Sequence, residues 1–190
     1  YLVASELFTT RSGPVRVLTT GIGEGKTIQK PDGQRFGPDG RLYAVAGGSE
    51  QILAYDASGK VTKIAEGFRG NDLVVAHNGN IYVTDPNWSG ANTNTSKVWL
   101  IKPDGTKQVV DTGLKFSNGI TLSPDQGTLA VSDYRGANVW TFRVGADGRL
   151  SGKAPCMTMR RPIDPAGEFK HNEPPPLKAE AGGDQRPGIA

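Results

Sequence analysis

Short apolar runs alternate along the chain with turns that contain Gly, Pro, Asn or Asp. The runs are rich in β-branched and aromatic residues, and Gly or Pro interrupts them every several residues. This pattern predicts β-strands, because an amphipathic helix needs a longer segment with apolar residues spaced three and four positions apart. We therefore expect an all-β fold.

One strand–turn–strand pattern occurs three times along the chain. Each copy carries a Pro-Asp-Gly or Asn-Gly type of turn, which suits a tight hairpin because these residues tolerate positive φ. The three copies span residues 34–45, 72–83 and 119–131. A third strand is predicted after each hairpin, at residues 51–55, 97–101 and 138–144. A fourth strand is predicted in the first two units, at residues 61–65 and 108–111.

Four antiparallel strands that repeat about every 40 to 50 residues are typical of a β-propeller, in which each unit is one blade. Residues before Lys30 predict part of another blade, with a strand at 15–19, so we expect about four blades of the 4 to 8 that propellers have. Residues 1–190 are therefore expected to form a single, incomplete β-propeller domain. A long Pro-rich loop between blades is expected at residues 154–183.

Charged residues are spread along the chain and change this picture little. The 22 Lys and Arg and 19 Asp and Glu residues give a formal net charge of +3, and no basic run is interleaved with aromatic residues, so nucleic acid is not an expected partner. No apolar stretch approaches the ~20 residues of a membrane-spanning helix, and we expect no membrane partner. The sequence does not decide whether the protein is cytoplasmic or periplasmic.

The single cysteine, Cys156, excludes an internal disulfide and Cys-based zinc motifs, and we expect it to be buried or inert.

Candidate chemistry lies just before the innermost strand of each unit. In a propeller these positions converge on the central axis, although they are far apart in sequence. A short oxygen-bearing side chain recurs there, at Asp32, Asn71, Asn118 and Asp184. Carboxylate and amide oxygens are the ligands that Ca²⁺ prefers, so the set predicts a divalent-cation site. Each residue taken singly also fits a turn, because Asn and Asp beside Gly are common turn residues.

Two segments resemble a known family. Residues 116–125 read Phe-Ser-Asn-Gly-Ile-Thr-Leu-Ser-Pro-Asp and resemble the Pro-Asn-Gly-Ile-Ala-Leu-Ser-Pro-Asp signature of the gluconolactonase, regucalcin and luciferin-regenerating-enzyme-like (SGL) family, and residues 70–86 resemble its Asn-Asp hairpin. The resemblance implies a six-bladed β-propeller with one divalent cation in its central channel, Ca²⁺ first, with Zn²⁺, Mn²⁺ or Mg²⁺ as alternatives. It also implies hydrolysis of a small-molecule substrate, a sugar lactone or related ester.

The resemblance also implies roles for particular residues. The positions of metal ligands are matched by Asn71, Asn118 and Asp184. It also makes Arg69 and Asn71 candidates for substrate binding. Two further candidates come from the residues themselves: Asp32, at the recurring position, and Trp88, which lies in a loop and whose indole can stack on a sugar ring. In the implied reaction the cation polarises the lactone carbonyl, and Asp184 acts as the general base that takes a proton from water.

Two departures from the family pattern leave a second hypothesis open. No segment near the amino end matches the family's metal-binding Glu, and Gln185 follows Asp184 where the family has Gly. A site with fewer anionic ligands binds Ca²⁺ more weakly. The alternative is a non-catalytic β-propeller that binds a small ligand or a protein partner through the same channel end. Association with another chain is a further expectation, because it would close the ring of blades.

Overall fold

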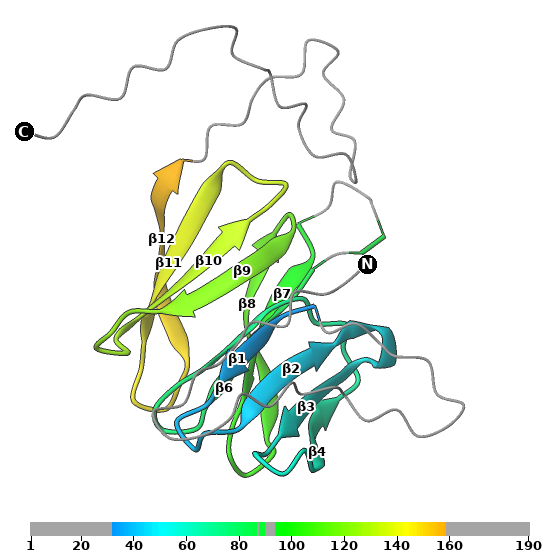
Figure 1. The fold of residues 1–190 in the computed structure, drawn as a ribbon. Coiled ribbons are helices and arrows are strands. Elements are labelled where there is room, and N and C mark those ends of the chain that lie inside the picture. The colour runs from blue at the N-terminus through cyan, green and yellow to red at the C-terminus, as the bar shows by residue number, and fades with distance from the viewer. Residues whose placement is uncertain (1–31, 87, 90–93, 159–190) are drawn as a thin grey trace, which may run out of the picture. The chain divides into compact units, whose positions relative to one another are not determined.

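The computed structural model describes residues 32–86, 88–89 and 94–158. These residues form twelve β-strands in three four-stranded antiparallel sheets (Figure 1). Within the described ranges the only helix is a short 3-10 turn, η1 (Gly47–Ser49), and no helix there is long and apolar enough to cross a membrane. The expected all-β class is confirmed, while the described residues form three separate sheets and no closed ring.

Each sheet is a meander, in which strands adjacent in sequence are also hydrogen-bonded neighbours. The first sheet contains β1 (Gln34–Phe36), β2 (Leu42–Ala46), β3 (Gln51–Tyr55) and β4 (Val61–Glu66). The second contains β5 (Leu73–Val75), β6 (Ile81–Asp85), β7 (Ser96–Ile101) and β8 (Lys107–Leu114). The third contains β9 (Ser117–Leu122), β10 (Thr128–Asp133), β11 (Asn138–Val144) and β12 (Leu150–Thr158). The predicted hairpins are confirmed as β1–β2, β5–β6 and β9–β10.

The third sheet is completed by β12, a strand that the sequence pattern did not predict. Residues 154–158, expected to begin the Pro-rich loop, belong to this strand, which pairs with β11. Almost all its residues are exposed, so no apolar alternation marks it, and as an edge strand it tolerates Pro155. Cys156 lies in β12 and is exposed, so the expectation of burial is wrong. Residues 159–183 of the expected loop and the strand expected at 15–19 lie outside the described residues.

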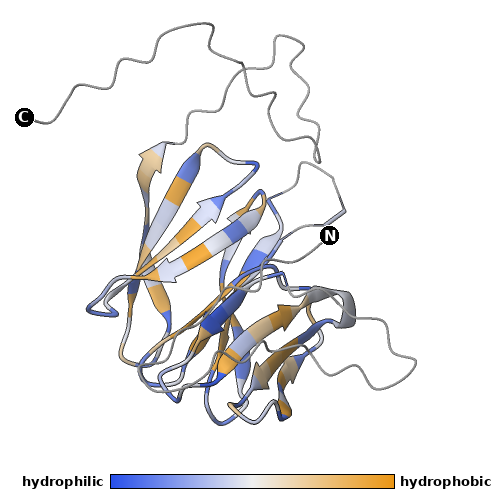
Figure 2. Ribbon diagram, viewed as in Figure 1, coloured by the Kyte–Doolittle hydropathy of each residue, from blue (hydrophilic) through white to orange (hydrophobic). Residues whose placement is uncertain are grey.

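Two apolar cores separate the three sheets. The core between the first and second sheets includes Val45, Ile52, Leu73, Val83 and Ile101. The core between the second and third sheets includes Tyr82, Leu100, Leu129, Val131 and Phe142. The second sheet therefore has both faces buried. In β6, Ile81 and Val83 belong to one core and Tyr82 to the other, so side chains on both faces of this strand are buried. Hydrophobic residues also lie along strands of the first and third sheets (Figure 2).

The innermost strands of the three sheets lie next to one another, because β5 contacts both β1 and β9. The chain segments that enter these strands therefore meet at one end of the sheets. We call this the site end; it comprises those entering segments and the links β2–β3, β6–β7 and β10–β11. The hairpin turns β1–β2, β3–β4, β5–β6, β7–β8, β9–β10 and β11–β12 lie at the opposite end, which we call the turn end.

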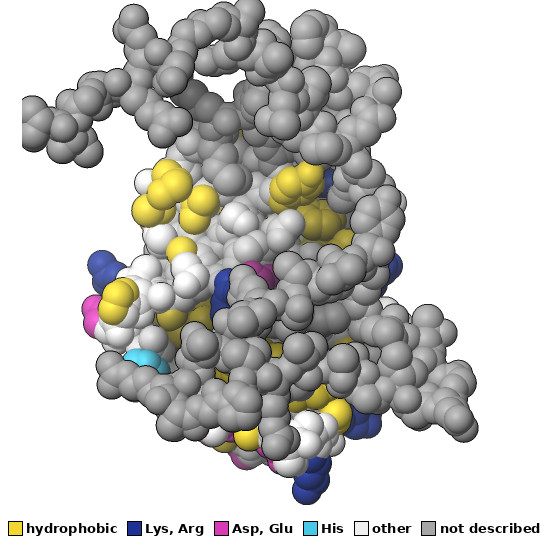
Figure 3. All heavy atoms as spheres, viewed as in Figure 1, with side chains coloured by type: hydrophobic (Ala, Val, Ile, Leu, Met, Phe, Trp, Pro, Cys, Tyr) yellow, Lys and Arg dark blue, Asp and Glu magenta, His cyan; other side chains and the backbone are white. Residues whose placement is uncertain are grey.

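Hydrophobic side chains also reach the surface of the described residues (Figure 3). The large exposed ones are Phe36, Val61, Val109 and Met157. Three of them lie on β4, β8 and β12, the outermost strand of each sheet. Outer strands have a hydrogen-bonded neighbour on one side only, so exposure there fits their place in the fold.

Candidate functional site

Three of the four predicted oxygen-bearing residues lie at the site end, at the entrance to an innermost strand. Asp32 and Asn71 precede β1 and β5, and their backbone N–H groups donate to the second strand of the same sheet at 2.9 and 2.8 Å. Asn118 lies in a bulge of β9, where the pairing with β10 is shifted. The structure therefore places these residues at matching positions of adjacent strands. The fourth, Asp184, lies outside the described residues.

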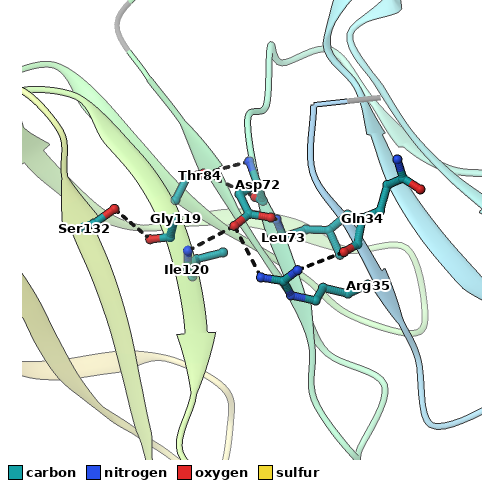
Figure 4. A network of polar contacts seen from close by, with 8 residues as sticks. All are labelled: Gln34, Arg35, Asp72, Leu73, Thr84, Gly119, Ile120 and Ser132. Atoms are coloured by element: carbon teal, nitrogen blue, oxygen red, sulfur yellow. Dashed lines mark hydrogen bonds and ion pairs between the residues drawn. The ribbon is translucent and has the colours of Figure 1, made fainter. Parts of the chain in front are cut away.

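Asp72 connects the three innermost strands (Figure 4). Its Oδ1 accepts the N–H of Leu73 at 2.9 Å, and its Oδ2 accepts the N–H of Ile120 in β9 at 3.3 Å. The guanidinium of Arg35 in β1 lies 3.8 Å from Oδ2, and the Asp72 side chain is only 16% exposed. The backbone is fixed as well, because the hydroxyl of Thr84 accepts the Asp72 N–H at 3.0 Å. The carboxylate is thus a point at which the three sheets meet.

Glycines at the equivalent positions make room for this carboxylate. Gly33 and Gly119 stand in the first and third units where the second unit has Asp72. A Cβ atom at Gly33 would overlap Asp72 Oδ1 and come within 2.6 Å of Asp72 Cα, whereas one at Gly119 would lie 4.0 Å from Oδ2. Asp72 was not among the predicted site residues. Its signal in the sequence is the break in the repeat, with Asp where the other units have Gly.

Asp32 lies against two other segments of the site end. Desolvation by burial raises the pKa of the Asp32 carboxyl above its ordinary value, while the Arg69 guanidinium and the N–H of Gly47 act to lower it. A Cβ atom at Gly47 would overlap Asp32 Oδ2, so glycine there lets the carboxylate approach the backbone. The positive charge of Arg69 therefore acts on Asp32, and both are predicted substrate-binding residues.

Arg69 and Trp88, both predicted to bind substrate, are in contact. The Arg69 guanidinium carbon lies 4.6 Å from the centre of the Trp88 ring, and the indole N–H donates to the Arg69 carbonyl at 2.9 Å. Trp88 meets Phe116 edge-on, with 5.4 Å between ring centres, and the Arg135 guanidinium lies over Phe116 at 4.7 Å. Stacking on a ring orients a guanidinium while its N–H groups remain in its own plane, where they can donate.

Asp133 holds the segment that leads into β9. Its buried carboxylate accepts the N–H groups of Phe116 at 2.8 Å, Lys115 at 3.1 Å and Gly136 at 3.0 Å. These bonds join the β8–β9 link to the β10–β11 link and fix the start of β9. Asp133 was also not among the predicted site residues. The signal for it is an Asp at the end of the second strand in two of the three units, Asp85 and Asp133.

The oxygen donors among the described residues are of the kind that a hard cation prefers, but they do not form a complete cation site. Asn71 and Asn118 are half-buried and carry amide oxygens, which suit Ca²⁺. In the part of the chain that the structure describes, no group of three or more His, Cys, Asp or Glu side chains could hold a metal ion. The predicted anionic ligand, Asp184, lies outside the described residues.

A groove of about 590 Å³ lies at the turn end, between the hairpin turns of the first and second sheets. Its lining includes Tyr43, His77 and Lys102. None of the described site candidates lines this groove. The groove and the candidate site are therefore separate features of the fold.

Residues 61–167 match the family model described as "SMP-30/Gluconolactonase/LRE-like region". The match covers more than half of the chain. The chain belongs to this family. The resemblance inferred from residues 70–86 and 116–125 is therefore confirmed, and both segments fall within the matched region.

Relatives of the SMP-30/gluconolactonase/LRE-like chain include two gluconolactonases. One, from Zymomonas mobilis, is 28% identical over 134 residues, which make up 62% of this chain and 38% of that protein. The other, a solved structure from Xanthomonas campestris, is 28% identical and covers 64% of this chain and 46% of its own, with a TM-score of 0.55. A luciferin-regenerating enzyme shares the fold at 16% identity and a TM-score of 0.52, over 63% and 43% of the two chains. The chain thus spans less than half the length of these relatives.

Proposed function

We propose that this chain contributes to a six-bladed β-propeller that hydrolyses sugar lactones or related esters. The observation that carries the proposal is the placement of Asn71 and Asn118 at matching positions of adjacent innermost strands. Two gluconolactonases, each 28% identical to the chain, support the substrate class. Three meanders in a chain that spans less than half of these relatives support the propeller, because each meander has the form of one blade.

The proposed site uses one divalent cation, with Ca²⁺ as the first choice and Zn²⁺, Mn²⁺ or Mg²⁺ as alternatives. Asn71 and Asn118 would hold it through their amide oxygens, and Asp184 would supply an anionic ligand. When bound, such a cation acts as a Lewis acid toward the lactone carbonyl. The choice of Ca²⁺ rests on oxygen donors, which hard cations prefer.

The protein's own residues bind the substrate and move protons. The Arg69 guanidinium, oriented by the Trp88 ring, donates to substrate oxygens, and Asp32 beside it accepts from a substrate hydroxyl. Asp184 is the proposed general base, which takes a proton from the attacking water. The water oxygen bonds to the carbonyl carbon, the ring C–O bond breaks, and the ring oxygen receives the proton that Asp184 took from the water. The product is the open-chain hydroxy acid.

A pH-stat assay of the full chain with gluconolactone tests this function. The protein is first treated with EDTA, and Ca²⁺, Mn²⁺ or Zn²⁺ is then added in separate runs. We expect acid release above the spontaneous rate only when a cation is present. No cation-dependent turnover, together with a melting temperature that the cations leave unchanged, would contradict the hydrolase.

Single substitutions test the proposed roles. Asp184→Asn should abolish turnover, whereas Arg69→Ala should mainly raise KM, because it removes a contact to the substrate rather than the base. Asp104→Asn is the control, since Asp104 is exposed at the turn end and accepts an N–H of its own turn. Equal and small effects of the first two variants would contradict the assignment of roles.

A second candidate function is non-catalytic binding of a small ligand or a protein partner at the site end. Its motivation is that residues 32–86, 88–89 and 94–158 contain no group of three or more His, Cys, Asp or Glu side chains that could hold a metal ion. Calorimetric titration with the hydroxy acid separates the two functions. Binding of the hydroxy acid without any turnover of the lactone supports this second candidate.

A further inference from the structure

We propose that Asp72 is a positioning residue: its carboxylate links the innermost strands of the three sheets and sets where Asn71 and Asn118 lie relative to each other. The effect on catalysis rests on the proposed function. The link itself rests on the geometry of described residues.

The link runs through both carboxylate oxygens. Asp72 directly follows Asn71, and its Oδ1 accepts the N–H of Leu73, the first residue of β5. Its Oδ2 accepts the N–H of Ile120, two residues beyond Asn118 in β9. One side chain therefore joins the two strand segments that carry the predicted metal ligands.

Arg35 extends the link to the first sheet. Its guanidinium lies 3.8 Å from Asp72 Oδ2 and also donates to the carbonyl of Gln34 at 3.1 Å. The Arg35 side chain is half exposed, so solvent weakens this ion pair. The hydrogen bond from Ile120 in β9 is therefore the stronger part of the link, and the bond from the adjacent Leu73 fixes the carboxylate at the start of β5.

A carboxylate is the group that this position requires. Each oxygen of Asp72 accepts an N–H group, so both ends of the side chain must be acceptors. An Asn side chain has one acceptor oxygen, and its NH₂ group would face the N–H of either Leu73 or Ile120. Asp72→Asn therefore removes the negative charge and one of the two hydrogen bonds while nearly preserving the size and shape of the side chain.

The first measurement compares Asp72→Asn with Asp104→Asn in the full chain. We expect Asp72→Asn to lower kcat and the calorimetric affinity for Ca²⁺ by about 10- to 100-fold, the usual effect of removing a group that orients a metal ligand. KM should change much less, because Arg69 and Trp88 are not bonded to Asp72. Asp104→Asn should keep both values. A lower melting temperature with wild-type kcat and wild-type affinity would overturn the positioning role.

The second measurement, amide hydrogen exchange, does not depend on activity. The N–H of Ile120 should exchange about tenfold faster or more in Asp72→Asn, because it loses a charged acceptor. The N–H of Phe116, held by Asp133, should exchange at the wild-type rate. Equal protection of Ile120 in the two proteins would show that the link does not order β9.

Together the two measurements distinguish this inference from the proposed function. A wild-type chain without cation-dependent turnover contradicts the hydrolase, and the exchange of Ile120 still decides whether Asp72 links the strands. Wild-type turnover that Asp72→Asn leaves unchanged contradicts the role of Asp72 alone.

Discussion

Carboxylates at the two ends of the sheets have different partners. At the turn end they accept N–H groups of their own hairpin turns: Asp39, Asp56, Asp104, Asp125 and Asp147. At the site end they accept N–H groups from other strands or links: Asp72, Asp85 and Asp133. The first kind stabilises a turn that a single hairpin can form by itself. The second kind forms only when strands distant in sequence have come together.

The surroundings of the two kinds differ in the same way. Hydrogen bonds from the same turn lower the pKa of three exposed carboxyls, those of Asp56, Asp104 and Asp125. At the site end, desolvation by burial is the largest cause and raises the pKa of Asp32 and Asp85. Perturbation by burial beside specific charged partners is typical of functional sites. This contrast is a physical reason, independent of the family, for proposing the candidate chemistry at the site end.

The largest effect is expected from Asp133→Ala. The backbone N–H groups of Phe116 and Lys115 would lose their acceptor at once, whereas the N–H of Gly136 would keep the backbone carbonyl of residue 133, and each unsatisfied buried group costs about 1–3 kcal/mol. The free energy of unfolding, measured by urea denaturation, should fall by about 2 kcal/mol or more. Asp147→Ala is the matched change at the turn end, where water replaces the lost acceptor, and should have little effect. Losses of equal size would remove the distinction between the two ends.

A second effect concerns the space around Asp72. Gly33→Ala places a Cβ atom against Asp72, and overpacking of this kind costs about 1–3 kcal/mol of unfolding free energy. Gly119→Ala is its control in the third unit, because the nearest atom there is the Ser132 Oγ at 3.3 Å and Asp72 Oδ2 is 4.0 Å away. Neither glycine has a positive φ, so the pair compares space alone. Urea denaturation that ranks Gly119→Ala as the more harmful would contradict the packing described for Asp72.

The sequence predicted those parts of the fold that local chemistry determines. The hairpin β5–β6 was predictable because Asn78 and Gly79 form its turn and an apolar run follows, and Gly79 does adopt a positive φ of 83°. The strand β12 was not predictable from the sequence, because an edge strand held by backbone pairing needs no apolar face. The exposure of Cys156 was not predicted for the same reason, because Cys156 lies in this strand.

Only those residues of the candidate site that recur in each repeated unit could be predicted from the sequence. Asp32, Asn71 and Asn118 recur at one position of each unit, and the structure places them at matching strand entrances. Asp72 and Asp133 bond to strands or links that are distant in the chain, and a pattern within one unit does not reveal such partners. The contact of Arg69 with Trp88 likewise depends on how two site-end links meet.

A smaller effect is expected where the turn end does connect two sheets. The buried hydroxyl of Tyr82 in β6 donates to the carbonyl of Gly148 in the β11–β12 turn at 2.8 Å. Desolvation, with a contribution from Asp147, raises the pKa of Tyr82 to about 12, so the hydroxyl remains a donor at neutral pH. Tyr82→Phe should lower the free energy of unfolding by about 1 kcal/mol, read from urea denaturation. An unchanged midpoint would mean that this bond adds nothing to the core beside it.

The smallest effect is the response of the two ends to acid. Because the pKa values of Asp56, Asp104 and Asp125 are lowered on folding, their contribution is present above the unfolded value of about 4 and is lost as the pH falls through the folded values. The pKa of Asp85 is raised, so its contribution is fully present below about pH 4 and is lost as the pH rises through the folded value.

Melting temperatures between about pH 6 and pH 3 should therefore fall less in a triple Asp→Asn variant of the three turn residues than in the wild type. The same scan should show a steeper fall in Asp85→Asn, which lacks the site-end carboxyl that gains stability on protonation. If both variants follow the wild-type curve, or if their order is reversed, the electrostatic contrast between the two ends is wrong.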